Sequence, residues 1–171
     1  MEKQKTKLNS YLSFKLGNET FASNVSKVLN ILEMMKITKV PKAPSYMKGV
    51  INLRGVVLPV IDTRLKFGMT TIEETTNTCI LVLDVNVDGE SVNVGAMVDA
   101  VEEVLELNEE DIQPPPSIGS NYKSEFIYGM AKKGEQFIML LDMDKVFSTE
   151  EIIDLKENLA KSKIAKEIIK K

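Results

Sequence analysis

The chain has 171 residues, 43% of them hydrophobic, with one cysteine and no histidine. This length and composition fit one globular domain or two small units sharing a core, and a lone cysteine excludes an internal disulfide. The lack of histidine removes the commonest general base and the commonest metal ligand, which counts against most hydrolases and metal sites.

Charge is distributed unevenly along the chain. Residues 1–72 carry 12 Lys and Arg against 4 Asp and Glu, whereas residues 73–171 carry 10 against 21. The two halves could pair with each other or form solvated faces; alternatively, such asymmetry steers charged partners. No apolar run reaches the length that spans a membrane, about 18 residues, and the charged N-terminus lacks the apolar segment of a signal peptide. A cytoplasmic protein is therefore expected.

The first part of the chain predicts a tail and a hairpin. Residues 1–10 are expected to form a flexible tail. From Tyr11, "YLSFKLG" alternates apolar and polar residues, and "ETFASNV" follows as a second strand after a turn at Gly17-Asn18. The next segment, "NVSKVLNIL", could be a short helix capped by Asn24 or a continuing strand, and its apolar spacing favours the helix.

A second hairpin is predicted in "GVINLRGVVLPVI". Its turn falls at Arg54-Gly55, where glycine can supply a positive φ. Pro59 indicates that its strand has a free side or a bulge at that point. "DTRLKFG" then predicts a short helix, capped by Asp62 and ended by Gly68.

Residues 69–77 are polar and predict a connection. Three strands are then expected in "TCILVLDV", "ESVNVGAMVDAV" and "EEVLEL", with a turn signal at Asp88-Gly89. After a proline-rich loop, "FIYGMAKKGEQFIMLLDMDKVF" predicts a last hairpin that turns at Lys133-Gly134. The strand groups before and after residue 70 suggest a mainly β fold built of two small barrels.

Residues 148–171 differ in character and predict an amphipathic helix. Ser148 and Glu151 form a capping box, and apolar residues follow on a helical stripe. We expect this helix to pack on its own barrel, with a membrane-surface or partner-binding helix as the alternative.

The sequence offers little chemistry. It has no glycine-rich phosphate loop and no serine in a G-x-S-x-G setting. Cys79 lies in an apolar run and is expected to be buried and reduced. Asp142 and Asp144 are the only candidate carboxylate pair, and we expect them to cap the exit of the last hairpin. No catalytic residue, cofactor or metal is therefore predicted.

Nucleic-acid binding is also not expected. The chain has no Trp, its pI is about 5.2, and its few aromatic residues do not alternate with the basic ones. The basic residues in question are Lys36, Lys39, Lys42 and Lys48.

Arg54 stands out because it places a permanent charge between two apolar strands. Its guanidinium, held on a tight turn, suits a carboxylate or the backbone carbonyls of a partner. Alternatively, Arg54 is a turn residue that serves solubility or pairs with an internal acid.

Three segments together resemble the CheW family of chemotaxis coupling proteins. They are "GVINLRGVVLPVIDTRLKFG", "VGAMVDAVEEVLELNEEDIQPPP" and "FIYGMAKKGEQFIMLLDMDKVF", and the resemblance covers about residues 9–150. It implies two five-stranded SH3-like β-barrels, consecutive or intertwined, over residues 11–147, with a sequence change near 70–77. It also implies a non-enzymatic adaptor that couples the cytoplasmic tips of chemoreceptors to the histidine kinase CheA.

The resemblance further implies a place at the inner face of the membrane, within receptor arrays. An alternative is a CheW-like module in a non-motility signalling complex. Carried over by position, the receptor-binding residues would be Val28, Ile31, Gly49, Arg54, Val101 and Val104, and the kinase or ring contacts would be Gln113 and Ile118. For each valine the alternative is simple core packing.

Overall fold

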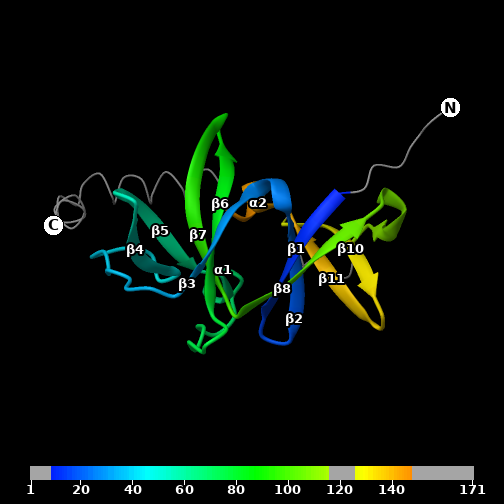
Figure 1. Cartoon of the computed structure of the whole chain (residues 1–171), viewed down its shortest axis with the longest axis horizontal. Coiled ribbons are helices and arrows are strands. Elements are labelled where there is room, and N and C mark those ends of the chain that lie inside the picture. Colours follow the sequence, from blue (N-terminus) through cyan, green and yellow to red (C-terminus); the bar gives the residue numbers. More distant parts are fainter. Residues whose placement is uncertain (1–8, 116–125, 148–171) are drawn as a thin grey trace.

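The computed structural model describes residues 9–115 and 126–147, which form two β-sheets joined by short helices (Figure 1). The six-stranded sheet has the strand order β8-β1-β2-β11-β10-β9, and the five-stranded sheet has the order β3-β6-β7-β5-β4. The predicted helix at 148–171 lies outside the described residues. Asn9 and Ser10, predicted as part of the tail, belong to the first strand.

The bounds of the elements are as follows. The strands are β1 (Asn9–Leu16), β2 (Glu19–Asn24), β3 (Val28–Glu33), β4 (Met47–Leu53), β5 (Val56–Asp62), β6 (Cys79–Val87), β7 (Glu90–Val98), β8 (Ala100–Leu107), β9 (Ile112–Gln113), β10 (Ile127–Lys133) and β11 (Gln136–Leu141). The short helices are η1 (Val25–Lys27), α1 (Thr63–Lys66), η2 (Glu109–Asp111) and α2 (Met143–Val146).

The predicted mainly β fold with two small units is confirmed, with two differences. One sheet has six strands instead of five, because the two-residue strand β9 adds to its edge. The sequence change at residues 70–77 does not separate the units, since it joins β5 to β6 within the five-stranded sheet. The chain instead crosses between the sheets after β2 and after β7, so the two units are intertwined.

The two sheets repeat one topology. Each contains a single parallel pair, β5 with β7 and β2 with β11, and the strand β5 or β11 leads into a short helix. In each sheet, the segment that follows one edge strand pairs with the opposite edge. After β3, Thr38 bridges Val50 of β4, and after β8, the strand β9 pairs with β10.

The segments 46–67 and 126–147 occupy equivalent places in the two sheets. The same residue type stands at matching positions of both segments: Gly49 corresponds to Gly129, Asp62 to Asp142, and Phe67 to Phe147.

The predicted turns are confirmed by the backbone. Arg54 and Gly55 have φ angles of 55° and 85°, and Asp88 and Gly89 have 53° and 81°. Positive φ at both central residues matches the twist of the flanking strands in a two-residue hairpin. Pro59 lies just before the residues through which β5 pairs with β7, so the predicted free side of this strand is also confirmed.

The helix favoured for "NVSKVLNIL" is wrong. Asn24 does cap a helical segment, but η1 has only three residues, and β3 follows at once. The apolar spacing resembled a helix because β3 contains a bulge between Val28 and Asn30, which breaks the strict alternation of a strand.

A central cluster of buried side chains joins the two sheets. It includes Phe14 and Leu16 of β1, Leu81 and Leu83 of β6, and Phe147 after α2, all at most 2% exposed. Each sheet also has one smaller cluster of buried side chains of its own. Because the central cluster takes side chains from both sheets, the two units fold as one body.

Two ion pairs fasten the sheets at their crossing points. Arg64 of α1 binds the carboxylate of Asp99, between β7 and β8, with its Nε 2.9 Å from Oδ1. The backbone N–H of Gly17, in the β1–β2 turn, donates to the same carboxylate at 2.7 Å. The hydrogen bond that Arg64 donates to Asp99 raises the pKa of Arg64.

The second ion pair lies at the equivalent crossing point. Here the helix supplies the acidic residue and the segment between the sheets supplies the basic one. Asp144 of α2 accepts from Nζ of Lys27 at 2.9 Å and from the backbone N–H of Asn86, on β6, at 2.7 Å. Arg64 and Asp144 are equivalent positions in the repeated topology. Each helix therefore holds the other sheet through a carboxylate.

Candidate partner-docking site

The carried-over residues Val28 and Ile31 lie on β3, at one edge of the five-stranded sheet. Val28 is opposite Leu83, and Ile31 is opposite Leu81 on β6. Leu81 and Leu83 are two residues apart and share a face, and cross-strand partners point to the same side of a sheet. The bulge thus places Val28 and Ile31, three residues apart, on one face.

Val101 and Val104 show the same arrangement on β8, the edge of the six-stranded sheet. Val101 is opposite Phe14, and Val104 is opposite Leu12, with a register shift between the two pairs. Leu12 and Phe14 share a face of β1. The two valines therefore also lie on one face, although they too are three residues apart.

Both faces belong to the central cluster between the sheets. Val28 and Val101 are partly buried and pack against it, whereas Ile31 is 47% exposed and Val104 is 57% exposed. We call these four residues the apolar seam. Figure 1 shows β3 leaving the middle of the molecule toward one side and β8 leaving it toward the other, in opposite directions. The seam combines a packed inner valine and an exposed outer side chain from each sheet.

Gly49 does not lie on this surface. It is buried in β4 and has a φ of 149°, and a Cβ at this position would lie 2.2 Å from the carbonyl oxygen of Thr38. The two backbone hydrogen bonds between Thr38 and Val50 hold these segments together at 2.8 and 2.9 Å. Gly49 therefore permits the close approach of two backbone segments, and its role here is structural.

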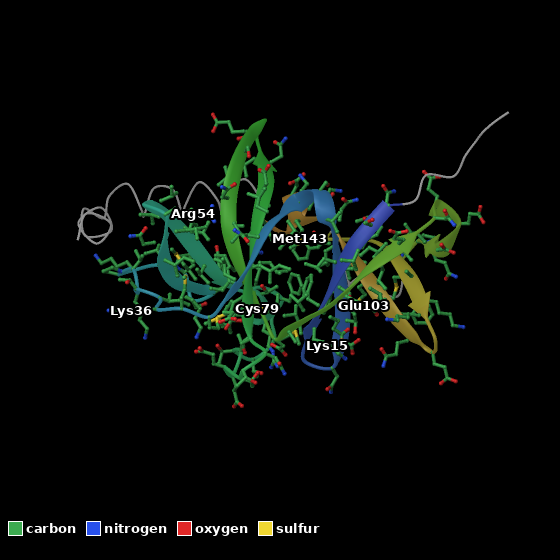
Figure 2. All side chains as sticks on the ribbon, in the orientation of Figure 1. Lys15, Lys36, Arg54, Cys79, Glu103 and Met143 are labelled. Carbon is green, nitrogen blue, oxygen red and sulfur yellow. The ribbon has the colours of Figure 1, made fainter. Side chains whose placement is uncertain are left out.

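Arg54 lies apart from the seam. It is exposed on the β4–β5 turn, and the backbone N–H of Gly55 donates to Oδ1 of Asn52 at 2.8 Å, which stiffens the turn. Nothing in residues 9–115 or 126–147 forms a hydrogen bond or an ion pair with the Arg54 side chain. Figure 2 shows Arg54 on the five-stranded side of the molecule and Glu103 of β8 in the other half. The guanidinium is thus open to a partner.

Of the two carried-over ring contacts, one can be placed. Gln113 is exposed on β9, at the opposite edge of the six-stranded sheet from β8 in strand order. Ile118 lies outside the described residues. Gln113 and the seam residues of β8 therefore lie at the two ends of the strand order of the same sheet, whereas the seam residues of β3 belong to the other sheet.

The candidate carboxylate pair has structural partners. Oδ1 of Asp142 accepts from the backbone N–H groups of Asp144 and Lys145, which caps α2 as predicted. Asp144 does not share this role, since it holds Lys27 and Asn86. Within the described ranges there is no cluster of metal-ligating side chains and no helix long and apolar enough to cross a membrane.

Cys79 is free and buried, as predicted, and burial raises the pKa of its thiol. The backbone of Val101 has the opposite, smaller effect and lowers the pKa of this thiol, and Cys79 is opposite Glu33 on β3. The start of β8 therefore lies near the end of β3.

Some exposed apolar residues were not predicted as part of a site. Leu29, in the bulge of β3, is 53% exposed, and Val56, which follows the Arg54-Gly55 turn, is 60% exposed. Leu29 follows Val28 on β3, and Val56 is two residues from Arg54. Leu29 belongs to the apolar spacing that favoured a helix, and Val56 to a predicted apolar strand, and neither pattern distinguishes an exposed side chain from a buried one.

The chain is similar to known proteins of one family. The family model of the CheW-like domain matches residues 10–151. The chain is similar to the chemotaxis protein CheW of Klebsiella aerogenes, with 38% identity over 152 residues and 89% of each chain covered. It is also similar to CheW of Rhizobium meliloti, with 38% identity and coverage of 82% and 88%.

A solved structure shows the same fold. The crystal structure of the scaffolding protein TtCheW from Thermoanaerobacter tengcongensis matches with a TM-score of 0.72 and 29% identity, covering 82% of this chain and 93% of that one. The chain therefore belongs to the CheW family of chemotaxis scaffolding proteins, a non-catalytic family.

Proposed function

We propose that this protein couples the cytoplasmic tips of chemoreceptors to the histidine kinase CheA by docking both. Its place would be in the cytoplasm, at the inner face of the membrane, within receptor arrays. The observation that carries the proposal is the apolar seam: two edge strands from different sheets present exposed apolar side chains beside one core. Large exposed apolar side chains grouped in this way are typical of protein-binding surfaces.

The receptor tip is assigned to the seam, with Arg54 as a second contact. A helix that covers Ile31 and Val104 would bury about half of each side chain, and burial of a whole side chain of this kind contributes about 1.5–3 kcal/mol. Arg54 adds a charged fork on a stiff turn, which can bind a carboxylate or backbone carbonyls with little loss of entropy. Gly49 supports this region from within β4 and needs no contact with the partner.

The regulatory domain of CheA is assigned to the far edge of the six-stranded sheet, around Gln113 and Ile118. The exposure of Gln113 on an edge strand supports this assignment. We expect both partners to bind at once, because the two assigned contacts lie on different strands. The receptor can alter kinase activity only as far as the bound assembly distinguishes its signalling states.

Isothermal titration of the full chain with a receptor-tip fragment tests the receptor assignment. Ile31→Ser should weaken binding about tenfold, because about 1.4 kcal/mol of apolar burial is lost, and Arg54→Ala should also weaken it. Phe137→Ser is the matched control, since Phe137 is 48% exposed on β11, outside the seam. Equal effects of Ile31→Ser and Phe137→Ser would contradict the assignment.

Binding of the CheA regulatory domain is the second arm of this titration. Ile31→Ser and Arg54→Ala should leave it unchanged, because neither residue lies at the Gln113 edge. Each variant is expected to fold with a stability within about 1 kcal/mol of the parent, as is usual for surface changes.

A further inference from the structure

The hairpin of β6 and β7 extends past the point at which α2 meets it. The backbone N–H of Asn86 donates to Asp144 of α2 at 2.7 Å. The N–H of Gly17 takes the equivalent place on the other sheet, where the hairpin of β1 and β2 already turns. β6 instead continues to Val87. Figure 1 shows β6 and β7 projecting beyond the other strands, at the top of the view.

This extra length carries buried apolar side chains. Val87, the last residue of β6, is 5% exposed, although its neighbours Asn86 and Asp88 are both exposed. Val85 is fully buried, and Val92, opposite Val85 on β7, is partly buried. Because residues two apart on a strand share a face, the three valines form one apolar surface, which we call the hairpin face. A two-stranded hairpin buries such a face only when another segment packs on it.

The C-terminal segment starts where such a cover is needed. α2 is held against β6 by the hydrogen bond between Asn86 and Asp144, and it ends at Val146. Ser148 follows Asp144 by four residues, which corresponds to about 6 Å along a helix. The chain therefore leaves the described part of the structure beside the hairpin, and its continuation can reach Val87 without a long connection.

The sequence of this segment suits an apolar face. Ile152, Leu155 and Leu159 are three and four residues apart, which places them on one stripe of a helix. The stripe would extend about 10 Å along the helix axis. Val85 and Val87 are about 7 Å apart along their strand. The stripe therefore matches the hairpin face in length as well as in polarity.

We propose that residues 148–171 form a helix that docks on the hairpin face through this apolar stripe. The occupant of the face is thus a segment of the same chain. The docked stripe is not available to a membrane surface or to a partner, which are the alternatives that the sequence left open. This inference is independent of the proposed adaptor function, because the hairpin face contains no residue of the seam.

Paramagnetic relaxation enhancement, measured on the full chain, tests the contact. A nitroxide on Asp88→Cys, next to the hairpin face, should broaden the methyl signals of the stripe. The same label on Glu135→Cys, in the exposed β10–β11 turn of the other sheet, is the matched control and should leave them sharp. Cys79 is buried, so the label reacts with the introduced cysteine. No broadening from Asp88→Cys, or equal broadening from both labels, would overturn the inference.

A mixed sample identifies the occupant. Spin-labelled Asp88→Cys chains without isotopes are combined with isotope-enriched parent chains, so that only contacts between different chains are detected. We expect the stripe signals to stay sharp. Broadening in this sample would assign the hairpin face to a second copy of the chain and would also overturn the inference.

Thermal unfolding gives a second, energetic readout. Leu155→Ala should lower the Tm by about 4–8 °C, as expected when a buried leucine is truncated. Glu157→Ala is the control and should change the Tm by less than about 1 °C, because Glu157 lies on the opposite side of the helix from the stripe.

A double variant connects the two surfaces. In a Val87→Ala background, Leu155→Ala should lower the Tm less than it does in the parent, because the effects of residues in contact are not additive. Full additivity of the two changes, or a loss for Leu155→Ala no larger than for Glu157→Ala, would show that the stripe does not pack on the hairpin face.

Discussion

At Gly49 the backbone of β4 passes close to the segment at Thr38. An added Cβ would meet a carbonyl oxygen at 2.2 Å, and the φ of 149° is one that L side chains rarely adopt. Gly129 holds the equivalent position on β10, where a Cβ would lie 2.5 Å from Cγ2 of Ile112. A side chain can rotate away where a backbone carbonyl cannot, so the two glycines should differ in tolerance.

Gly49→Ala should therefore lower the free energy of unfolding by about 3 kcal/mol, and Gly129→Ala by about 1 kcal/mol. Urea unfolding followed by circular dichroism measures both values. If Gly49→Ala proved as stable as the parent and instead weakened receptor binding, Gly49 would be a contact residue.

Single residues differ in how much of their role the sequence shows. The turn at Arg54-Gly55 was predictable because glycine and the flanking apolar runs form a local signal. The role of Gly49 was not, because the obstacle to a side chain is Thr38, which no local pattern connects to β4. The resemblance to CheW singled out Gly49 as a receptor-binding position, and that role stays a prediction.

At the scale of the elements, bulges determine where the seam residues point. Without them, residues three apart on β3 and on β8 would face opposite sides of their sheets. The same bulge in β3 produces a three-residue apolar spacing, which is also typical of a helix and therefore predicted one there. A bulge depends on the register with a neighbouring strand, and the segment itself carries no clear sign of it.

The helices α1 and α2 each supply one residue of the ion pair at a crossing point. Asp99 binds Arg64 and accepts from Gly17, and its side chain is 18% exposed; Asp144 binds Lys27, and its side chain is 33% exposed. The more buried pair is screened less by water. The Arg64–Asp99 contact should therefore contribute more to holding the sheets together.

Asp99→Ala should lower the free energy of unfolding by about 2 kcal/mol, and Asp144→Ala by about 1 kcal/mol. Glu135→Ala, in the exposed β10–β11 turn, is the control and should change it by less than about 0.5 kcal/mol. Thermal and urea unfolding give the three values. A loss for Asp99→Ala no larger than for the control would show that the central cluster alone sets the arrangement of the sheets.

At the scale of the whole molecule, strands from distant parts of the chain share each sheet. The sequence predicted most strands and their turns, yet it suggested a division near residue 70, because neighbours in sequence usually pair. The parallel pair of β2 with β11 connects residues more than 100 positions apart, which local patterns cannot reveal. Only the resemblance to CheW allowed for intertwined units.

The uneven charge of the chain also has a structural use at this scale. Arg64 and Lys27 come from the basic first part, and their partners Asp99 and Asp144 come from the acidic second part. At these crossing points the two parts pair with each other, which is one of the alternatives that the uneven charge left open.

In the proposed function, one chain holds two partners through separate strands. Analytical ultracentrifugation of the full chain mixed with a receptor-tip fragment and the CheA regulatory domain tests this arrangement. We expect one complex that contains all three proteins, with Ile31→Ser removing only the receptor fragment. Competition between the two partners, so that each displaces the other from the chain, would contradict it.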